Sequence, residues 1–423
     1  MHSRTALPTF FLVALLASCG AGDEHPAIAP RAGAWLLELD LGEGNILPFG
    51  FDLAHDSAGW QITVHNGTEH IVVDDVHFAN DTMRVRMPLF DSEFVGVFSS
   101  DTVFAGQWSN HLKGPDYHIP FIATAGDRSR FAVRNTNSAR DMSGAWETHY
   151  SQGTPDAYDA IGVFTQDGSH ASGTFVTETG DYRYLDGVVD GDSLKLSCFD
   201  GTHAFLFKAG WRNDSLFGRF WSGTHWQEPW VAVRNASYKL RDPDSLTALR
   251  EGYDMADFSF PGLDGGMVSP KDEEHAGRVL MVQVMGSWCP NCVDETLLLD
   301  EMYAKYHDDG LSVIALAFEQ HTDSVKAIAG LKRFRDRLHV KYDIAYAGPA
   351  NKDAAARQLP FLDHVMSYPT CIFIDRAGKV RRIRTGFYGP GTGEHYLNYR
   401  RNLEQFLERM LAEPVPTALP KAA

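Results

Sequence analysis

The chain has 423 residues, 44% of them hydrophobic, and a formal net charge of −17. This length exceeds one ordinary core, so we expect two to four domains that fold without a disulfide framework. The acidic balance argues against nucleic acid or an anionic membrane surface as a partner, because either would require a basic face.

The first residues have the pattern of an export signal. A basic start, MHSR, precedes ALPTFFLVALLA, an apolar stretch too short to span a membrane comfortably. The segment Leu16-Ala17-Ser18-Cys19 resembles the bacterial lipobox, which implies cleavage before Cys19 and its lipidation. The alternatives are an ordinary signal that merely passes a cysteine and an uncleaved anchor. Gly20 at the next position is compatible with the outer membrane of a Gram-negative cell.

The first half contains a duplicated unit. GAWLLEL at residue 33 recurs as GAWETHY at residue 144. Gly33 to Asp81 and Gly144 to Asp192 both span 48 positions, and these aspartates belong to the matching runs NDTMRVRM and GDSLKLSC. The match continues through DTVFAGQWS and DSLFGRFWS, and it closes with IPFIAT and EPWVAV.

Within each unit, short runs such as GWQITV, TMRVRM, SLKLS and GTFVTE alternate apolar and polar residues between turn signals such as HNG and DGD. They predict antiparallel strands joined by tight turns. About six or more strands in about a hundred residues is typical of a meander curled into a barrel or sandwich. Two small barrels in tandem and one larger barrel of two halves both satisfy the pattern.

Tryptophans recur at equivalent positions of the two units. We expect Trp35 and Trp146 to plug the barrel ends, although their Gly-x-Trp context faintly resembles the sealing motif of lipocalin-like proteins. Trp108 and Trp221 are also equivalent and are expected in the core, with a ligand-binding face as the alternative. The histidines of this half have no metal-ligand spacing on any one strand.

A change of period near residues 240–255 predicts a linker or short helix before an α/β domain. The strand-like runs that follow are RVLMVQVMG, LSVIALAFE, YDIAYA and the pair in TCIFIDRAGKVRRIRTG. The helical runs are CVDETLLLDEMYAKYHDD, DSVKAIAGLKRFRDRL, NKDAAARQL and EHYLNYRRNLEQFLERMLAE. This order, with its closing hairpin, predicts a mixed sheet covered on both faces.

The cysteine spacing indicates a dithiol that takes part in chemistry. If Cys19 carries lipid, Cys289 and Cys292 form the one pair close in sequence, so this exported chain has no disulfide framework. Structural zinc needs four ligands, and neither a second Cys-x-x-Cys nor a paired histidine spacing accompanies this motif. We therefore expect no metal, and no cofactor other than the redox-active Cys289–Cys292 disulfide.

Trp-Cys-x-x-Cys at a strand-to-helix junction resembles the thioredoxin fold, and more closely the TlpA/ResA-like family of exported, membrane-tethered thiol–disulfide oxidoreductases. The resemblance covers roughly 256–412 and rests on DFSFPGLDGGMVS, GSWCPNCVDE, SYPT, IDRAGKV and GFYGPGTGEHY. It implies that Pro369 is a cis-proline beside the dithiol and presents an extended edge to the substrate backbone. Tyr368 and Thr370 flank that proline as substrate-binding residues, and Trp288 lies at the rim of the dithiol.

The same resemblance implies that Glu295 manages protons for the buried cysteine; the alternative is an acid that complements the helix dipole. Gln283 stands where cytoplasmic thioredoxins carry a buried Asp, and its amide cannot take a proton from Cys292. Cys371 stands where the family often has Thr or Leu. We expect a buried inert thiol there; if its side chain faced the dithiol, it would trap Cys289 or Cys292 instead.

The position of the two cysteines at the start of a helix supports the same assignment. Cys289 falls where the helix begins, so unpaired backbone N–H groups and the positive end of the helix dipole favour its thiolate. The thiolate is the attacking species, which makes Cys289 the nucleophile. Cys292, nearly one helical turn later, is placed to attack the mixed disulfide as the resolving cysteine.

These features predict an envelope, lipid-anchored, periplasm-facing thiol–disulfide oxidoreductase, more a reductase than an oxidant. Its partners would be a client protein disulfide and a membrane thiol that donates electrons, and not nucleic acid. One alternative is a ligand- or protein-binding β module with a subordinate thioredoxin-like domain, and another is a holdase with a vestigial dithiol. The predicted divisions are a signal peptide (1–18), a lipidated cysteine with its tether (19–32), two β repeats (33–135 and 144–236), a linker (237–255), a thioredoxin-like domain (256–415) and a tail (416–423).

Overall fold

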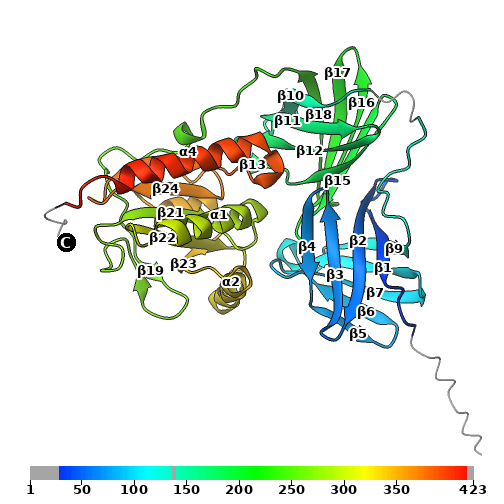
Figure 1. Cartoon of the computed structure of the whole chain (residues 1–423), viewed down its shortest axis with the longest axis horizontal. Helices are drawn as coiled ribbons and strands as arrows, with labels where there is room; N and C mark the ends of the chain where they lie inside the picture. Colours follow the sequence, from blue (N-terminus) through cyan, green and yellow to red (C-terminus); the bar gives the residue numbers. More distant parts are fainter. Residues whose placement is uncertain (1–27, 136–139, 417–423) are drawn as a thin grey trace, which may run out of the picture.

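A computed structural model of the chain describes residues 28–135 and 140–416. Two β-domains and one α/β domain follow one another along the sequence, and the α/β domain lies against both β-domains (Figure 1). The predicted signal peptide and Cys19 lie outside the described residues. Within the described ranges, no helix combines the length and the apolar character that crossing a membrane requires.

The first β-domain, barrel 1, is a nine-stranded antiparallel meander in the order β4-β3-β2-β1-β9-β8-β7-β6-β5. β1 and β9 pair with Trp35 opposite Ala125, so the start and the end of the repeat meet. Among the described strands, β4 and β5 at the two ends of the sheet do not pair with each other, which leaves an open seam. The strands are β1 Gly33–Asp40, β2 Ile46–Asp56, β3 Gly59–Asn66, β4 Glu69–Val73, β5 Val76–Ala79, β6 Thr82–Arg86, β7 Ser92–Ser100, β8 Val103–Asn110 and β9 His118–Ala125.

The second β-domain, barrel 2, closes where barrel 1 stays open. β12 pairs along its length with β11 and, through His170 opposite Val188, with β14, so the chain of paired strands returns to its start. No strand of barrel 1 pairs with a described strand of barrel 2, so two tandem barrels, and not one larger barrel, are correct. The strands are β10 Gly144–Tyr150, β11 Tyr158–Asp167, β12 His170–Thr177, β13 Gly180–Asp181, β14 Leu185–Asp190, β15 Ser193–Phe199, β16 Ala204–Arg212, β17 Ser215–Ser222 and β18 Trp226–Arg234.

The two barrels repeat the same tryptophan anchor. The indole N–H of Trp35 donates to the carbonyl of Arg31 at 2.9 Å, and that of Trp146 donates to the carbonyl of Met142 at 3.0 Å. Both rings are fully buried. Because each indole finds a carbonyl four residues earlier, the ring can enter an apolar core without leaving its N–H unpaired.

The barrels pack against each other through both apolar and charged contacts. Phe49 of barrel 1 stacks on Phe199 of barrel 2 with ring centroids 4.6 Å apart. The buried Arg130, which follows barrel 1, pairs with Asp186 at 3.0 Å and donates to the Ser197 hydroxyl at 2.9 Å. These contacts hold the two repeats as one unit.

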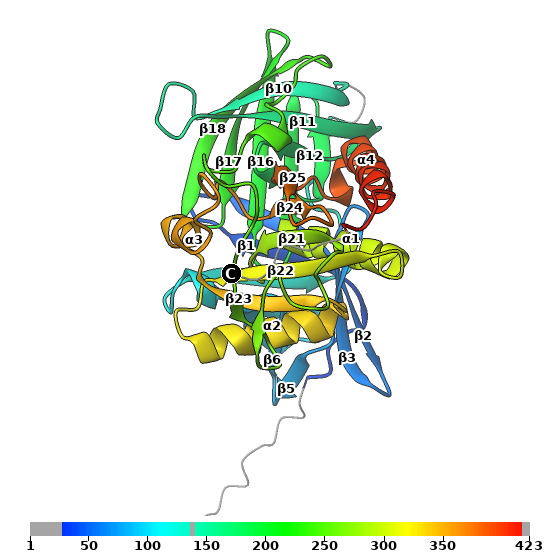
Figure 2. The same ribbon diagram turned by 90° about the vertical axis from the view of Figure 1, so that its left-hand side faces the viewer.

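The α/β domain contains a five-stranded mixed sheet in the order β23-β22-β21-β24-β25, in which only β24 runs antiparallel to the other four strands. All residues of β21, β22 and β24 are buried, as cover on both faces requires. Helices α1 and α4 lie side by side, joined by Lys305–Glu404, and α2 lies across the sheet from α4 (Figures 1 and 2). The elements are β19 Phe260–Pro261, β20 Met267–Val268, β21 Val279–Met285, α1 Pro290–Tyr306, β22 Leu311–Glu319, α2 Ser324–Leu338, β23 Asp343–Pro349, α3 Lys352–Gln358, β24 Thr370–Ile374, β25 Val380–Thr385 and α4 Glu394–Leu411.

The segment expected as a linker is fixed to the α/β domain. It contains one short 3-10 helix, Pro243–Ser245, whose Asp244 pairs with Arg382 at 2.6 Å. The hydroxyls of Thr247 and Thr385 lie 2.7 Å apart and are both buried. This segment therefore joins barrel 2 to the edge strand β25 through specific contacts.

Candidate active site

The dithiol lies at the N-terminus of α1, directly after β21. Cys289 is the N-cap residue in an extended conformation, and its Sγ accepts the Cys292 N–H at 3.3 Å. Pro290 is the first helical residue, where its missing N–H costs nothing and its fixed φ suits the helix. The first N–H groups of α1 and the positive end of the helix dipole therefore face the Cys289 sulfur.

The loop before β24 covers the other side of Cys289. The Cys289 thiol donates to the Tyr368 carbonyl at 3.6 Å, and the Tyr368–Pro369 peptide bond is cis. The side chain of Thr370 is fully buried, and its hydroxyl donates to the Ser367 carbonyl at 2.9 Å. The Tyr368 carbonyl thus borders the sulfur directly, with the cis bond to Pro369 next in the chain, whereas Thr370 holds the loop from within.

The second cysteine belongs to a buried polar group. Cys292 is fully buried, which raises the pKa of its thiol. Gln283 on β21 donates from Nε2 to Glu295 Oε2 at 3.0 Å and accepts from the Thr296 hydroxyl at 3.0 Å. Burial raises the pKa of Glu295 to about 7, and the hydrogen bond from Gln283 partly opposes this shift. Glu295 can therefore hold or release a proton near neutrality, beside a cysteine that must lose one.

Cys371 lies behind the dithiol in the sheet. It stands opposite Gln283 in the antiparallel pair of β21 and β24, so the two side chains share one face. Its thiol is fully buried, and burial, reinforced by the charge of Glu295, raises its pKa. Like Cys198 in barrel 2, it is a free buried thiol with little thiolate character.

A second buried acid, which the sequence patterns did not predict, lies beside the dithiol loop. Glu319, the last residue of β22, accepts the Ser287 N–H at 2.8 Å and the Ser287 hydroxyl at 2.7 Å. Burial raises the pKa of Glu319 to about 7. The available signal was an acid that ends the otherwise apolar run LSVIALAF. Glu319 anchors the residue two positions before the nucleophile.

Trp288 forms the rim of the dithiol loop. Its indole N–H donates to the Phe318 carbonyl at 2.9 Å, and its ring meets the Tyr368 ring edge to face at 5.6 Å. A Cβ at Gly286 would overlap the indole, so this close approach requires glycine. The half-buried ring is therefore held in one orientation next to Cys289.

Residues 179–183 of barrel 2, here named the cover segment, contact the dithiol loop. Asn291, between the two cysteines, donates to the Asp181 carbonyl at 3.3 Å. The Asp181 carboxylate accepts the Gly389 N–H at 2.6 Å, and the Ser367 hydroxyl donates to the Thr179 carbonyl at 3.0 Å. The active site thus has a wall from another domain, more than a hundred positions away in sequence.

One buried arginine joins all three domains beside the nucleophile. Arg183 of the cover segment pairs with Asp294 of α1 and with Glu69 on β4 of barrel 1. The exposed side-chain fractions are 8% for Arg183, 12% for Glu69 and 10% for Asp294, so the network is shielded from water. Burial strengthens these pairs and makes the loss of any one partner costly.

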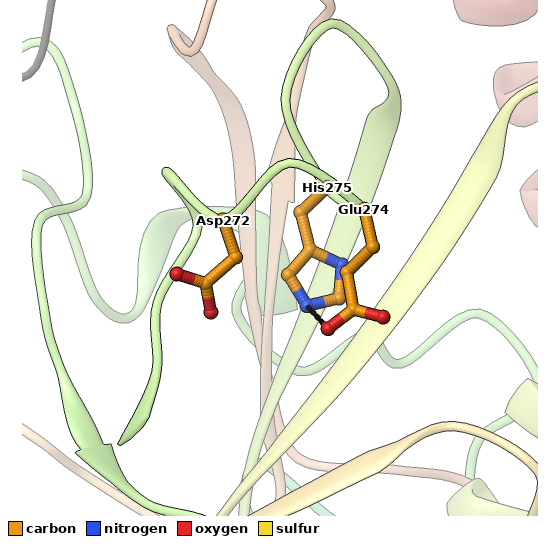
Figure 3. A group of neighbouring side chains, drawn as sticks. All are labelled: Asp272, Glu274 and His275. Atoms are coloured by element: carbon orange, nitrogen blue, oxygen red, sulfur yellow. Dashed lines mark ion pairs between the residues drawn. The ribbon is translucent and has the colours of Figure 1, made fainter. Parts of the chain in front are cut away.

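One group of potential metal ligands occurs among the described residues, at the far end of the sheet from the dithiol. Figure 3 shows Asp272, Glu274 and His275 on the loop before β21. The His275 imidazole binds the Ser312 hydroxyl through Nδ1 at 2.7 Å, and its Nε2 lies 3.4 Å from Asp343 Oδ2 and 3.8 Å from Glu274 Oε1. The group shares no residue with the dithiol site.

The mouth of barrel 2 forms an aromatic pocket with a volume of about 570 Å3. Asn291 of the dithiol loop forms part of its wall. Glu228 is buried there and accepts the Tyr158 hydroxyl at 2.9 Å, while Lys113 Nζ lies 3.0 Å from His225 Nε2. The aromatic side chains that line the pocket are Tyr158, Tyr182, Phe205, Phe220 and Trp226.

The fold and the Cys-x-x-Cys motif define the C-terminal part of this chain as a thioredoxin-like domain. Residues 252–383 match the AhpC/TSA family. The thioredoxin-like protein YneN of Bacillus subtilis is 28% identical over 138 residues, which cover 33% of this chain and 73% of that protein. The thiol-disulfide oxidoreductase ResA of Bacillus thuringiensis subsp. konkukian is 26% identical over 129 residues, which cover 30% of this chain and 66% of that protein.

A solved structure shows a similar partial correspondence. A thiol-disulfide isomerase of Corynebacterium glutamicum aligns with 39% of this chain and 99% of its own, at 19% identity and a TM-score of 0.30. These proteins are similar to this chain over 30–39% of its length. The two barrels lie outside the matched family region.

Proposed function

We propose that the chain is a thiol–disulfide oxidoreductase that acts as a reductase through a mixed disulfide at Cys289. The Cys289 thiolate attacks one sulfur of a substrate disulfide, whose other sulfur leaves as a thiol after protonation. Cys292 then attacks Cys289, which releases the reduced substrate and leaves a Cys289–Cys292 disulfide. Glu295 takes the proton that Cys292 must lose. No metal or further cofactor takes part.

The observation that carries this proposal is the different environment of the two sulfurs. Cys289 caps a helix N-terminus and keeps 7% of its surface exposed, whereas Cys292 is fully buried beside an acid with a pKa of about 7. The sulfur that keeps some access to solvent can meet a substrate disulfide first, and the fully buried one is kept for the second step. The names of the relatives support the same chemistry.

The proposed place of action is the cell envelope, with the chain anchored by lipid on Cys19 and facing the periplasm. The lipobox-like segment supports this, as does the resemblance to exported, membrane-tethered oxidoreductases. A membrane thiol would return the oxidised dithiol to its reduced form, and the substrate would be a molecule with an accessible disulfide. Metabolic labelling with a fatty-acid probe tests the anchor: Cys19→Ala should lose the label, and its retention would contradict the proposal.

Single-turnover oxidation of the reduced full-length chain tests the chemistry. Several disulfides of different size should each produce a Cys289–Cys292 disulfide, located by peptide mass mapping after acid quench. Cys371→Ser, which removes a buried thiol of the same domain, should behave like the wild type. If no disulfide forms between Cys289 and Cys292 with any oxidant in the series, the proposed activity is wrong.

A second candidate function is ligand binding by barrel 2, which the aromatic pocket favours. Its five aromatic side chains and the polar group at Glu228 and Lys113 have the composition of a small-molecule site. Trp226 is 43% exposed, so its fluorescence should report an occupant. A ligand screen that quenches the wild type but not Trp226→Phe would support this function. Quenching that survives in Trp226→Phe would show that the signal comes from elsewhere.

A further inference from the structure

The position of barrel 2 restricts how a substrate reaches Cys289. The cover segment binds Ser367 on one side of the sulfur and Asn291 on the other. A Cβ at Gly180 would overlap the Asn291 amide, so no chain fits between them. An extended peptide substrate would have to form backbone hydrogen bonds with the loop next to the nucleophile, where the backbone must be free to accept them. The cover segment already lies against the Ser367–Tyr368 backbone, where such pairing would have to occur.

The cover segment is held firmly in place. The buried network of Glu69, Arg183 and Asp294 ties it to α1 and to barrel 1 at once. On the other side of the molecule, Asp74 of barrel 1 pairs with Arg337 at 2.6 Å, and Asp91 pairs with His321 at 3.2 Å. Opening the active site on the barrel 2 side would leave two buried carboxylates without their cation.

A groove on the opposite side of the dithiol loop stays open. It has a volume of about 400 Å3 and lies over Ser287 and Trp288. Barrel 1 supplies one wall through Leu89, Phe90 and Leu112, and helix α2 supplies the other. This volume lies in the range of small-molecule sites.

The charge of the groove selects among small molecules. Its two acids are already engaged, Asp91 with His321 and Glu319 with Ser287. Its two exposed cations, Lys326 and Arg333, have no carboxylate within ion-pair distance among residues 28–135 and 140–416. In a chain with a net charge of −17, two cations without partners at the entrance favour an anionic ligand.

From this geometry we infer that the preferred substrate is a low-molecular-weight disulfide that carries carboxylates, and not a folded protein. The inference rests on the proposed oxidoreductase function. The Cys289 thiolate attacks one substrate sulfur, the substrate S–S bond breaks, and one carboxylate-bearing thiol leaves with a proton. Cys292 displaces the second thiol, so two electrons pass from the dithiol to the substrate, and a dithiol reductant restores the starting state.

The test compares three disulfides on the reduced full-length chain: oxidised glutathione, which is anionic, cystamine, which is cationic, and insulin. Each second-order rate is divided by the rate of the same disulfide with dithiothreitol, which removes differences in intrinsic reactivity. We expect the normalised rate for oxidised glutathione to exceed each of the others by about tenfold or more at low salt. An equal or faster normalised rate with insulin or cystamine would overturn the inference.

Variants separate the role of charge from that of the cover segment. Lys326→Ser combined with Arg333→Ser should bring the rates for oxidised glutathione and cystamine together, whereas Lys332→Ser on the same helix should change neither. Arg183→Ala, verified as folded by circular dichroism, should raise the normalised rate for insulin alone. If no disulfide oxidises the dithiol, the proposed function fails; if all three react alike, only the substrate inference fails.

Discussion

The inner and outer sides of the dithiol are built in different ways. The inner side consists of Gln283, Cys292 and Glu295 from two neighbouring elements of one domain, joined by hydrogen bonds of about 3 Å. The outer side is assembled from three domains, with the cover segment on one flank and barrel 1 near Trp288 on the other. The inner side therefore sets the chemistry of the sulfurs, and the outer side sets what can reach them.

The largest expected effect comes from removing the attacking sulfur. Cys289→Ser should lower the rate of disulfide reduction by about a thousandfold or more, because an alcohol cannot replace a thiolate. Cys292 and Glu295 act only after Cys289 has attacked, so they cannot compensate. Stopped-flow kinetics with oxidised glutathione measure this rate. Cys198→Ser, which removes a buried thiol of barrel 2, serves as the control and should keep the wild-type rate.

The next largest effect should come from the outer side. Arg183→Ala leaves Glu69 and Asp294 buried without their cation, so we expect a loss of about 3–5 kcal/mol in unfolding free energy. Urea denaturation measures this loss. Arg219→Ala changes an exposed arginine of the same barrel and should cost less than about 1 kcal/mol. Similar losses in the two variants would mean that the three-domain network does not stabilise the docking of barrel 2.

Glu295 should make stability depend on pH. Burial raises its folded pKa from 4.5 to about 7, so between these values the folded chain keeps a proton that the unfolded chain has released. The unfolding free energy contributed by Glu295 therefore falls as pH rises through this window, by about 3 kcal/mol in total. Glu295→Gln should remove this fall, and denaturation from pH 5 to pH 8 measures it.

Glu319→Gln is the matched control for that experiment. Glu319 is equally buried and its pKa is also raised to about 7, so its replacement should remove a similar part of the pH-dependent stability. Only Glu295→Gln should also change the pH profile of the step in which Cys292 displaces substrate. If both variants alter that profile equally, Glu295 has no specific role in proton transfer.

The smallest effect should come from the Tyr368 hydroxyl, which is buried and has no hydrogen-bond partner among the described residues. Tyr368→Phe removes this unpaired group, so we expect the unfolding free energy to fall by less than about 1 kcal/mol or to rise. Thr370→Val, which removes a hydroxyl that donates to Ser367, should instead lose about 1 kcal/mol. Thermal unfolding of the two variants distinguishes these outcomes.

The inner side could be predicted from sequence because its residues are close together in local patterns. Cys289, Cys292 and Glu295 occupy one strand-to-helix junction, and Gln283 lies six positions before the first cysteine on the preceding strand. The repeat was likewise visible, since Gly-Ala-Trp recurs at residues 33 and 144. In the structure, each of these segments opens a first strand that pairs with the last strand of its barrel.

The outer side could not be predicted in the same way. Thr179, Asp181 and Arg183 lie in or beside the two-residue strand β13, which has no motif, and they reach the dithiol only because barrel 2 docks on the α/β domain. Barrel 2 closes and barrel 1 stays open because their strands choose different partners. Both repeats show the same alternation of apolar and polar residues, so the sequence does not predict this difference. Domain docking is a property of complementary surfaces, which a single sequence does not display.

The most direct test of the account is the capture of its intermediate. Reduced Cys292→Ser should react with 5,5′-dithiobis(2-nitrobenzoate) to give one stable adduct on Cys289, identified by intact mass and peptide mapping. The wild type should instead release two equivalents of thionitrobenzoate and end with a Cys289–Cys292 disulfide. An adduct on Cys371 or Cys198, or none on Cys289, would contradict the assignment of Cys289 as nucleophile and Cys292 as resolving cysteine.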